Sequence, residues 1–138
     1  MMSEPIQARV ISRERVLFEG SAESVVAPAA NGQLGILPRH APLMAALGKG
    51  VLKIRSGRQK TYYAVFGGFI QVKDNRLIML VDKATAGADI DPAKAEEEVA
   101  ALKTKLQAGD TKTEEWKRLV KDLEVARVCL HAASLAHD

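Results

Sequence analysis

The sequence predicts a β-sandwich N-terminal domain followed by a C-terminal antiparallel α-helical hairpin. Short apolar or β-branched runs separated by turn residues recur through the first part of the chain, as in all-β domains. Beyond residue 88 the apolar residues fall instead at helical spacing. Residues 1–88 also carry an excess of basic side chains, and residues 89–138 an excess of acidic ones. We therefore predict two domains, spanning residues 1–85 and 89–138.

The strands of the first domain are predicted from apolar alternation and from β-branched and aromatic content. They span residues 6–11, 51–55, 61–66, 69–72 and 77–81, with residues 73–76 as a hairpin loop. No long helical pattern interrupts them, which favours an antiparallel sandwich or barrel over a parallel α/β sheet. The all-β domain is expected to end near Val81.

Gly67 and Gly68 lie between two of these predicted strands. Glycine permits a positive φ or a close approach of the backbone, so we predict a bulge or a tight corner here. A phosphate-binding loop would require a helix after the glycines and a suitably placed lysine. The strand-like residues that follow argue against that alternative.

The second domain begins after a small-residue linker, residues 84–88. Asp91 is a predicted N-cap, and Pro92 occupies the first helical position, where its missing N–H costs nothing. Gly109 is expected to end this helix, and Asp110 or Thr113 to cap the next. The predicted apolar stripes are Ala95, Val99, Leu102 and Leu106 in the first helix, and Trp116, Leu119, Val120, Leu123, Ala126 and Leu130 in the second.

The connection between the helices is short enough to make them antiparallel neighbours. Isolated helices of roughly 15–20 residues are marginal in water, and this hairpin has one narrow apolar seam. It must therefore gain stability by packing on the β domain or on another protein. A weakly held, charged hairpin on a stable β body is suited to moving.

Composition limits the class of protein. The 138 residues are 47% hydrophobic and 27% charged, as in ordinary folded domains, and the net charge of +3 is too small to indicate nucleic-acid binding. Cys129 is the single cysteine, which excludes an intramolecular disulfide and is typical of a small core residue in a reducing compartment. The first five residues include polar and turn-forming ones, unlike the start of a secretory signal.

The search for chemistry finds no catalytic residue and no metal site. His40, His131 and His137 lack the spacing and the further ligands of a metal centre. The serines lack a nucleophile-elbow pattern, and residues 96–98 are three glutamates typical of a solvated helix start. Aromatic residues do not interleave with the basic ones as in nucleic-acid binders. We expect a chain that performs no chemistry and needs no cofactor.

Residues 32–43 read Gly-Gln-Leu-Gly-Ile-Leu-Pro-Arg-His-Ala-Pro-Leu, a dense mixture of turn formers and apolar residues. Such a mixture predicts a shaped backbone that presents a surface. The segment strongly resembles the one characteristic of the epsilon subunit of F-type ATP synthases. Residues 66–72 are similar to that family's second signature. The resemblance covers the whole chain, although the hairpin agrees mainly in pattern.

The resemblance implies a non-catalytic rotor subunit that couples proton flow to ATP synthesis. In that family the sandwich docks on the gamma subunit and the c-ring, and the complex includes an alpha/beta catalytic head. We therefore expect peripheral membrane association through the complex, on the cytoplasmic face of a bacterial inner membrane or the stromal face of a thylakoid. The candidate docking residues are Pro38, Arg39, His40 and Pro42. Alternatively, His40 contacts a local backbone carbonyl and holds the turn.

The resemblance also implies that the hairpin either folds on the sandwich or extends toward the catalytic head and opposes ATP hydrolysis. In the family, basic side chains of the extended hairpin meet an acidic stretch of a beta subunit. The candidates here are Lys112, Lys117, Arg118, Lys121 and Arg127. Alternatively, these residues form a solvated face paired with Glu114, Glu115, Asp122 and Glu124.

Some bacterial members bind ATP in the folded hairpin through a motif that matches Ile90, Asp91, Lys94 and Ala95. Lysine replaces arginine at position 94, which removes the planar fork that grips phosphate. Thr85 stands where the best binders have an acidic residue. We predict weak or absent ATP binding, with Asp91 acting mainly as a helix cap.

Two other hypotheses about the function of the chain compete with the one that the family resemblance implies. One is a free-standing β-sandwich adaptor that binds a helical partner through its hairpin. The other, an independent enzyme for a small ligand, has no residues to support it.

Overall fold

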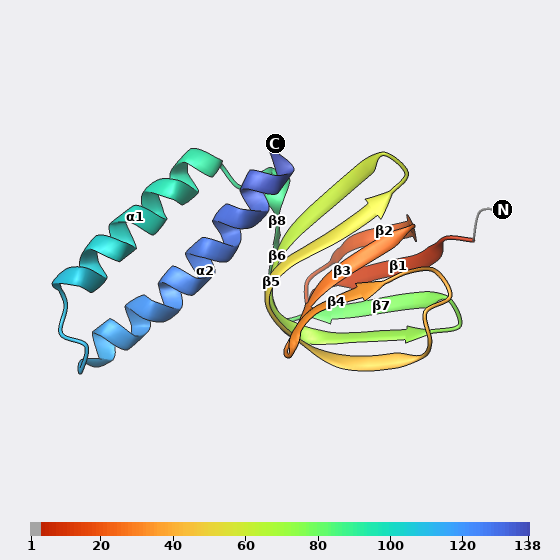
Figure 1. Ribbon diagram of the computed structural model, residues 1–138, viewed down its shortest axis with the longest axis horizontal. Coiled ribbons are helices and arrows are strands. Elements are labelled where there is room, and N and C mark those ends of the chain that lie inside the picture. Colours follow the sequence, from red (N-terminus) through yellow and green to blue (C-terminus); the bar gives the residue numbers. More distant parts are fainter. Residues whose placement is uncertain (1–3) are drawn as a thin grey trace.

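The computed structural model describes residues 4–138 and confirms a β-sandwich followed by a hairpin of two helices (Figure 1). The first three residues of the predicted 1–85 domain lie outside the described residues. The strands are β1 (Ile6–Ile11), β2 (Val16–Ala22), β3 (Ser24–Ala29), β4 (Gly32–Ile36), β5 (Leu43–Ser56), β6 (Gln59–Lys73), β7 (Arg76–Val81) and β8 (Ala84–Ala86). A 3-10 turn, η1 (Gly87–Asp89), leads to α1 (Pro92–Ala108) and α2 (Glu114–Ala136).

One hydrogen-bonded sheet forms both layers of the sandwich, in the order β2-β1-β7-β6-β5-β3-β4, with β8 also paired to β6. The long strands β5 and β6 run through both layers. The first layer holds β2, β1 and β7 with the start of β5 and the end of β6. The second layer holds β8, β3 and β4 with the start of β6 and the end of β5.

The glycines of β6 form the corner between the two layers. Gly67 and Gly68 have φ angles of 82° and 132°, which side-chain-bearing residues rarely adopt. Before this corner the odd-numbered residues Tyr63 and Val65 point into the main core. After it the even-numbered Ile70 does, so the side of the strand that faces the core is exchanged at the corner. A Cβ on Gly68 would collide with the backbone of the adjoining β7. The predicted corner is confirmed, and the two strands predicted on either side of it are parts of one.

The sequence-based prediction did not include β2, β3, β4 or β8. Residues 32–36, expected only as a shaped backbone segment, form β4 against β3. β5 begins at Leu43 rather than at Val51. Ala84–Ala86, predicted as part of a linker, form β8 by backbone pairing with β6. The β domain therefore continues beyond Val81 to Ala86.

The helix ends agree with the sequence-based prediction. The Asp91 carboxylate accepts from the backbone N–H groups of Ala93 and Lys94, and Pro92 opens α1. Gly109 follows the last residue of α1, and the Thr113 side chain caps α2. The hairpin seam is closed by Val99 and Leu102 of α1 with Leu123 and Ala126 of α2, flanked by Leu106, Leu119 and Leu130.

The hairpin is folded back, and the C-terminal half of α2 packs on the outer face of the second layer (Figure 1). Ala132 is buried there against Val51 and Ala64, with Val128, Cys129 and Leu135 half-buried around them. Gly87 of η1 approaches the backbone of Ala132 so closely that a side chain would not fit. Cys129 was expected to be a small core residue, and it lies half-buried in this interface.

We predict that Gly68→Ala destabilises the fold by about 3 kcal/mol or more, because it adds a clash to a strained φ. Gly35→Ala is the matched control, since a Cβ there meets no atom within 4 Å. It should change the free energy of unfolding by no more than about 0.5 kcal/mol. Urea unfolding of both variants measures the difference, and equal effects would contradict a special role for the corner.

Candidate functional site

The β4–β5 connection, residues 37–42, lies at the end of the sandwich opposite the hairpin (Figure 1). Arg39 has a φ of 65°, and its N–H donates to Asn75 Oδ1 at 2.8 Å. The Asn75 amide in turn donates to the Pro5 carbonyl at 3.1 Å. These bonds join the β4–β5 and β6–β7 turns to the N-terminal strand, so the connection has a defined shape.

The structure brings the predicted docking residues Pro38, Arg39, His40 and Pro42 together in this one connection. The N–H of His40 donates to the Leu37 carbonyl at 3.1 Å, and its Nδ1 lies 2.8 Å from the Ala41 carbonyl oxygen. The local, turn-holding role of His40 is therefore present. The Leu37 side chain projects outward and is 62% exposed.

A bare apolar face continues from this turn across the outside of the first layer. We define the bare face by Met44, Ala46, Phe69, Gln71, Ile78 and Leu80. Cross-strand pairing places Ala46 beside Phe69, and Phe69 beside Leu80. Met44, Phe69 and Leu80 are 71%, 61% and 54% exposed. Contiguous apolar patches of this kind mark interaction sites on folded proteins.

The sequence-based search missed the bare face, although a signal for it was present. Residues 77–81 are all apolar, whereas a strand with one solvated face alternates apolar and polar residues. Leu77, Met79 and Val81 are buried, so Ile78 and Leu80 must face outward. An uninterrupted apolar run in an antiparallel strand predicts a second covered face. Only the strand pairing shows that these residues form one patch, because Leu80 pairs with Phe69, and Gln71 joins Ile78 to Met44.

The two outer faces of the sandwich therefore differ in whether another part of the chain covers them. The hairpin covers the apolar residues of the second layer, chiefly Val51 and Ala64. In the part of the chain that the structure describes, no equivalent segment buries Met44, Phe69 and Leu80. The first layer thus presents the surface that a partner would bury.

The basic residues of the hairpin do not form one cluster. Lys117, Arg118 and Lys121 line a groove of about 520 Å³ between α2 and Lys49 of β5. Lys112 lies in the connection between the helices, and Arg127 lies on α2 outside this groove. All five predicted residues are exposed. Lys117 pairs with Glu114 at 3.3 Å, as the solvated-face alternative expects for this residue.

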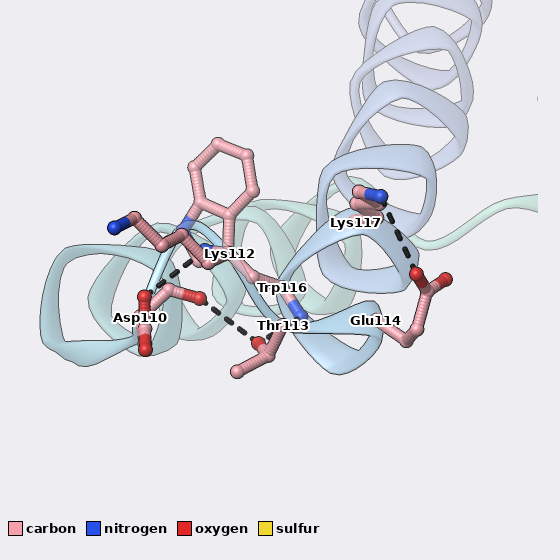
Figure 2. A network of polar contacts seen from close by, with 6 residues as sticks. All are labelled: Asp110, Lys112, Thr113, Glu114, Trp116 and Lys117. Carbon is pink, nitrogen blue, oxygen red and sulfur yellow. Dashed lines mark hydrogen bonds and ion pairs between the residues drawn. The ribbon is translucent and has the colours of Figure 1, made fainter.

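The hairpin tip is held by its own polar contacts (Figure 2). The Asp110 carboxylate accepts from the Lys112 N–H at 3.0 Å, and the Thr113 hydroxyl accepts from the Trp116 N–H at 3.1 Å. The Trp116 indole N–H donates to the Leu106 carbonyl at 3.2 Å. That carbonyl belongs to the last turn of α1, where helices leave acceptors without partners. The tip is thus ordered without help from the sandwich.

The residues of the predicted ATP motif lie at the start of α1. Ile90 is half-buried against the interface of hairpin and sandwich, and Ala95 is buried. Lys94 is exposed. Asp91 uses its carboxylate as the helix cap, with Oδ1 2.9 Å from the Ala93 nitrogen. The predicted capping role of Asp91 is confirmed, whereas weak or absent ATP binding stays a prediction.

Burial changes the pKa of two side chains, Tyr63 and Cys129. Burial raises the pKa of the Tyr63 hydroxyl, which donates to the Leu17 carbonyl at 3.0 Å. Burial also raises the pKa of the Cys129 thiol, with a smaller contribution from Glu98. Within residues 4–138 no cluster of His, Cys, Asp and Glu is arranged to hold a metal ion. No helix in this range is long and apolar enough to cross a membrane.

Solved structures share this fold. A chain of the Euglena gracilis mitochondrial ATP synthase, from a structure of its OSCP/F1/c-ring part, aligns with all of this chain and 84% of its own length, with a TM-score of 0.75. A chain of the Tetrahymena thermophila mitochondrial ATP synthase, from its central stalk and c-ring, aligns with a TM-score of 0.58 over 96% of this chain and 98% of its own length. Both are 18% identical in sequence, so they establish similarity of fold.

Other proteins are more similar to this chain in sequence than these two structures are. Residues 5–87 match the family described as the ATP synthase Delta/Epsilon chain, beta-sandwich domain. The ATP synthase epsilon chain of Cyanothece sp. is 41% identical over 130 residues, which cover 93% of this chain and 94% of that protein. The epsilon chain of Leptospira borgpetersenii is 44% identical over 112 residues, covering 81% and 87%. The sandwich, the hairpin and these identities agree: the chain belongs to the family of ATP synthase epsilon chains.

Proposed function

We propose that this chain is a non-catalytic central-stalk subunit of an F-type ATP synthase, which joins the gamma subunit and the c-ring. The observation that carries the proposal is the bare face beside the ordered turn of residues 37–42. Membership of the epsilon-chain family supplies the type of complex. The named assemblies of the structural neighbours, an F1/c-ring part and a central stalk with c-ring, support the place in it.

The bare face is assigned to the gamma subunit. Apolar side chains that are more than half exposed, such as Met44 and Phe69, become favourable only when a partner removes them from water. The adjacent turn, with Pro38, Arg39 and His40, is assigned to the polar loops of the c-ring. Its hydrogen bond to Asn75 preorganises it, which reduces the entropy lost on docking. The complex would hold the chain at a membrane surface, on the cytoplasmic side in a bacterium or the stromal side in a plastid.

The hairpin is assigned a regulatory role, in which its extended form opposes ATP hydrolysis in the alpha/beta head. Only the C-terminal half of α2 contributes buried residues to the interface with the sandwich, and these are small. The larger side chains of this interface, such as Tyr62, Phe66 and Leu135, are only partly buried, so docking contributes a modest free energy. A hairpin held in this way can leave the sandwich without unfolding it, because the main core does not include α2.

Replacing Phe69 by serine is expected to weaken binding of the gamma subunit by about 2 kcal/mol, since a large exposed apolar anchor is lost. Val26→Ser, on a half-buried position of β3 in the other layer, is the control and should leave binding unchanged. Co-purification with gamma and a c-ring measures the effect. Retention of both partners by the Phe69 variant would show that the bare face is not the docking surface.

Deleting residues 89–138 is expected to raise ATP hydrolysis by the assembled complex about fivefold, the range of an ordinary regulatory coupling. The sandwich core contains none of the deleted residues, so assembly should persist. Hydrolysis by complexes with and without the deletion is compared after assembly has been verified. An unchanged rate in a fully assembled complex would exclude an inhibitory hairpin.

Titration of the full chain with ATP is expected to show weak or no binding. The Asp91 carboxylate already serves the helix N-terminus, and Lys94 offers a point charge in place of a bidentate fork. Calorimetry measures the affinity, and Lys94→Arg tests whether the missing fork is the reason. Tight, stoichiometric binding by the unmodified chain would contradict this prediction.

A further inference from the structure

One stripe of α2 faces the sandwich, and its chemistry changes along the helix. Leu135, Ala132 and Val128 pack against the second layer. Toward the hairpin tip the same stripe continues through Glu124, Lys121 and Lys117. These residues follow Val128 at intervals of three or four, which places them on one face of the helix. Its C-terminal half is therefore apolar and docked, whereas its N-terminal half is charged.

The change from apolar to charged occurs at an ion pair. Lys49 Nζ of β5 lies 3.2 Å from Glu124 Oε2 of α2, and the two side chains are 48% and 54% exposed. The other salt bridges found in residues 4–138 lie within the sandwich or within α2. The Lys49–Glu124 pair is thus the one salt bridge in the described chain that joins the sandwich to the hairpin.

Between Glu124 and the hairpin tip, cationic side chains of α2 repel Lys49. Lys49 lines the same groove as Lys117, Arg118 and Lys121, so three further cations of α2 lie on its side of the helix. Glu114 also lines the groove, but it is paired with Lys117. Like charges in a partly screened groove disfavour closer approach of the helix to the sheet. Glu124 therefore compensates a charge on Lys49 that would otherwise push α2 away.

We propose that the Lys49–Glu124 pair is an electrostatic latch, which sets the fraction of molecules with the hairpin docked on the sandwich. The latch rests on the proposed function in one respect, because it regulates release of the hairpin assigned there. Two half-exposed partners change such an equilibrium by only about two- to fivefold. The apolar contacts around Ala132 hold the hairpin, and the latch tunes its release with ionic strength.

The thiol of Cys129 can report docking of the hairpin on the sandwich without an engineered cysteine. Cys129 is the single cysteine and lies half-buried in the interface between α2 and the sandwich. A bulky maleimide reaches the thiol fully only when the hairpin is released. The labelling rate of the full chain under mild conditions therefore reports the released fraction.

The variants are Glu124→Gln, Lys49→Gln and the double replacement, with Glu115→Gln as the matched control. Glu115 is an exposed carboxylate of α2 that does not line the groove of Lys49. We expect Glu124→Gln to raise the labelling rate about two- to fivefold at low salt, because Lys49 then loses its anionic partner and the cations of α2 remain beside it. The double replacement should return the rate toward that of the unmodified chain, and Glu115→Gln should not change it.

Two results would overturn the latch. One is a Glu124→Gln rate equal to that of the Glu115→Gln control. The other is an increase that persists in about 1 M salt, where exposed ion pairs are screened. Rates are measured at two pH values, and an increase confined to one of them would indicate an altered thiol and would also count against the latch. Unchanged thermal unfolding shows that each variant keeps its fold.

Hydrolysis assays separate the latch from the inhibitory role. In the assembled complex, Glu124→Gln is expected to lower ATP hydrolysis, because more hairpins are free to extend. Faster labelling with unchanged hydrolysis supports the latch and contradicts inhibition by the hairpin. Unchanged labelling rejects the latch, whatever the hydrolysis rate.

Discussion

The glycine corner of β6 is the constraint on which the rest of this molecule depends. Gly67 and Gly68 take positive φ angles and exchange the buried and exposed positions of the strand, so a single sheet closes over its own core. The same exchange directs Ala64 outward in the second layer and Phe69 outward in the first. One corner therefore produces two apolar outer faces, one covered by the hairpin and one left bare.

The two outer faces differ in their side chains, and this difference suits the proposed subunit, which has one fixed joint and one movable part. The bare face offers large side chains, Met44, Phe69 and Leu80, beside an ordered turn. The hairpin interface buries Val51, Ala64 and Ala132, with larger side chains only partly buried around them and a half-exposed ion pair at the edge. Because few side chains are fully buried between hairpin and sandwich, the proposed function lets this interface open while a partner stays docked on the bare face.

Local chemistry explains which features the sequence predicted. Asp91 before Pro92, Gly109 and Thr113 mark helix ends through interactions within a few residues, and all appear as expected. The corner at Gly67 and Gly68 was predictable because few residues besides glycine adopt such φ angles. β4 and β8 were missed because Gly32, Gly35 and the alanines of residues 84–86 have little strand propensity. Their backbones become strands only when β3 and β6 present hydrogen-bonding partners.

The sequence by itself determined the fold class, the family, the helix ends and the turn that carries His40, because each depends on short-range pattern or on motif. Only the tertiary structure decided that Met44, Phe69 and Leu80 form one surface, that the hairpin is folded back, and that Lys49 meets Glu124. The physical reason is distance along the chain. Lys49 and Glu124 are 75 residues apart, and contacts of that range arise from packing, which no local pattern records.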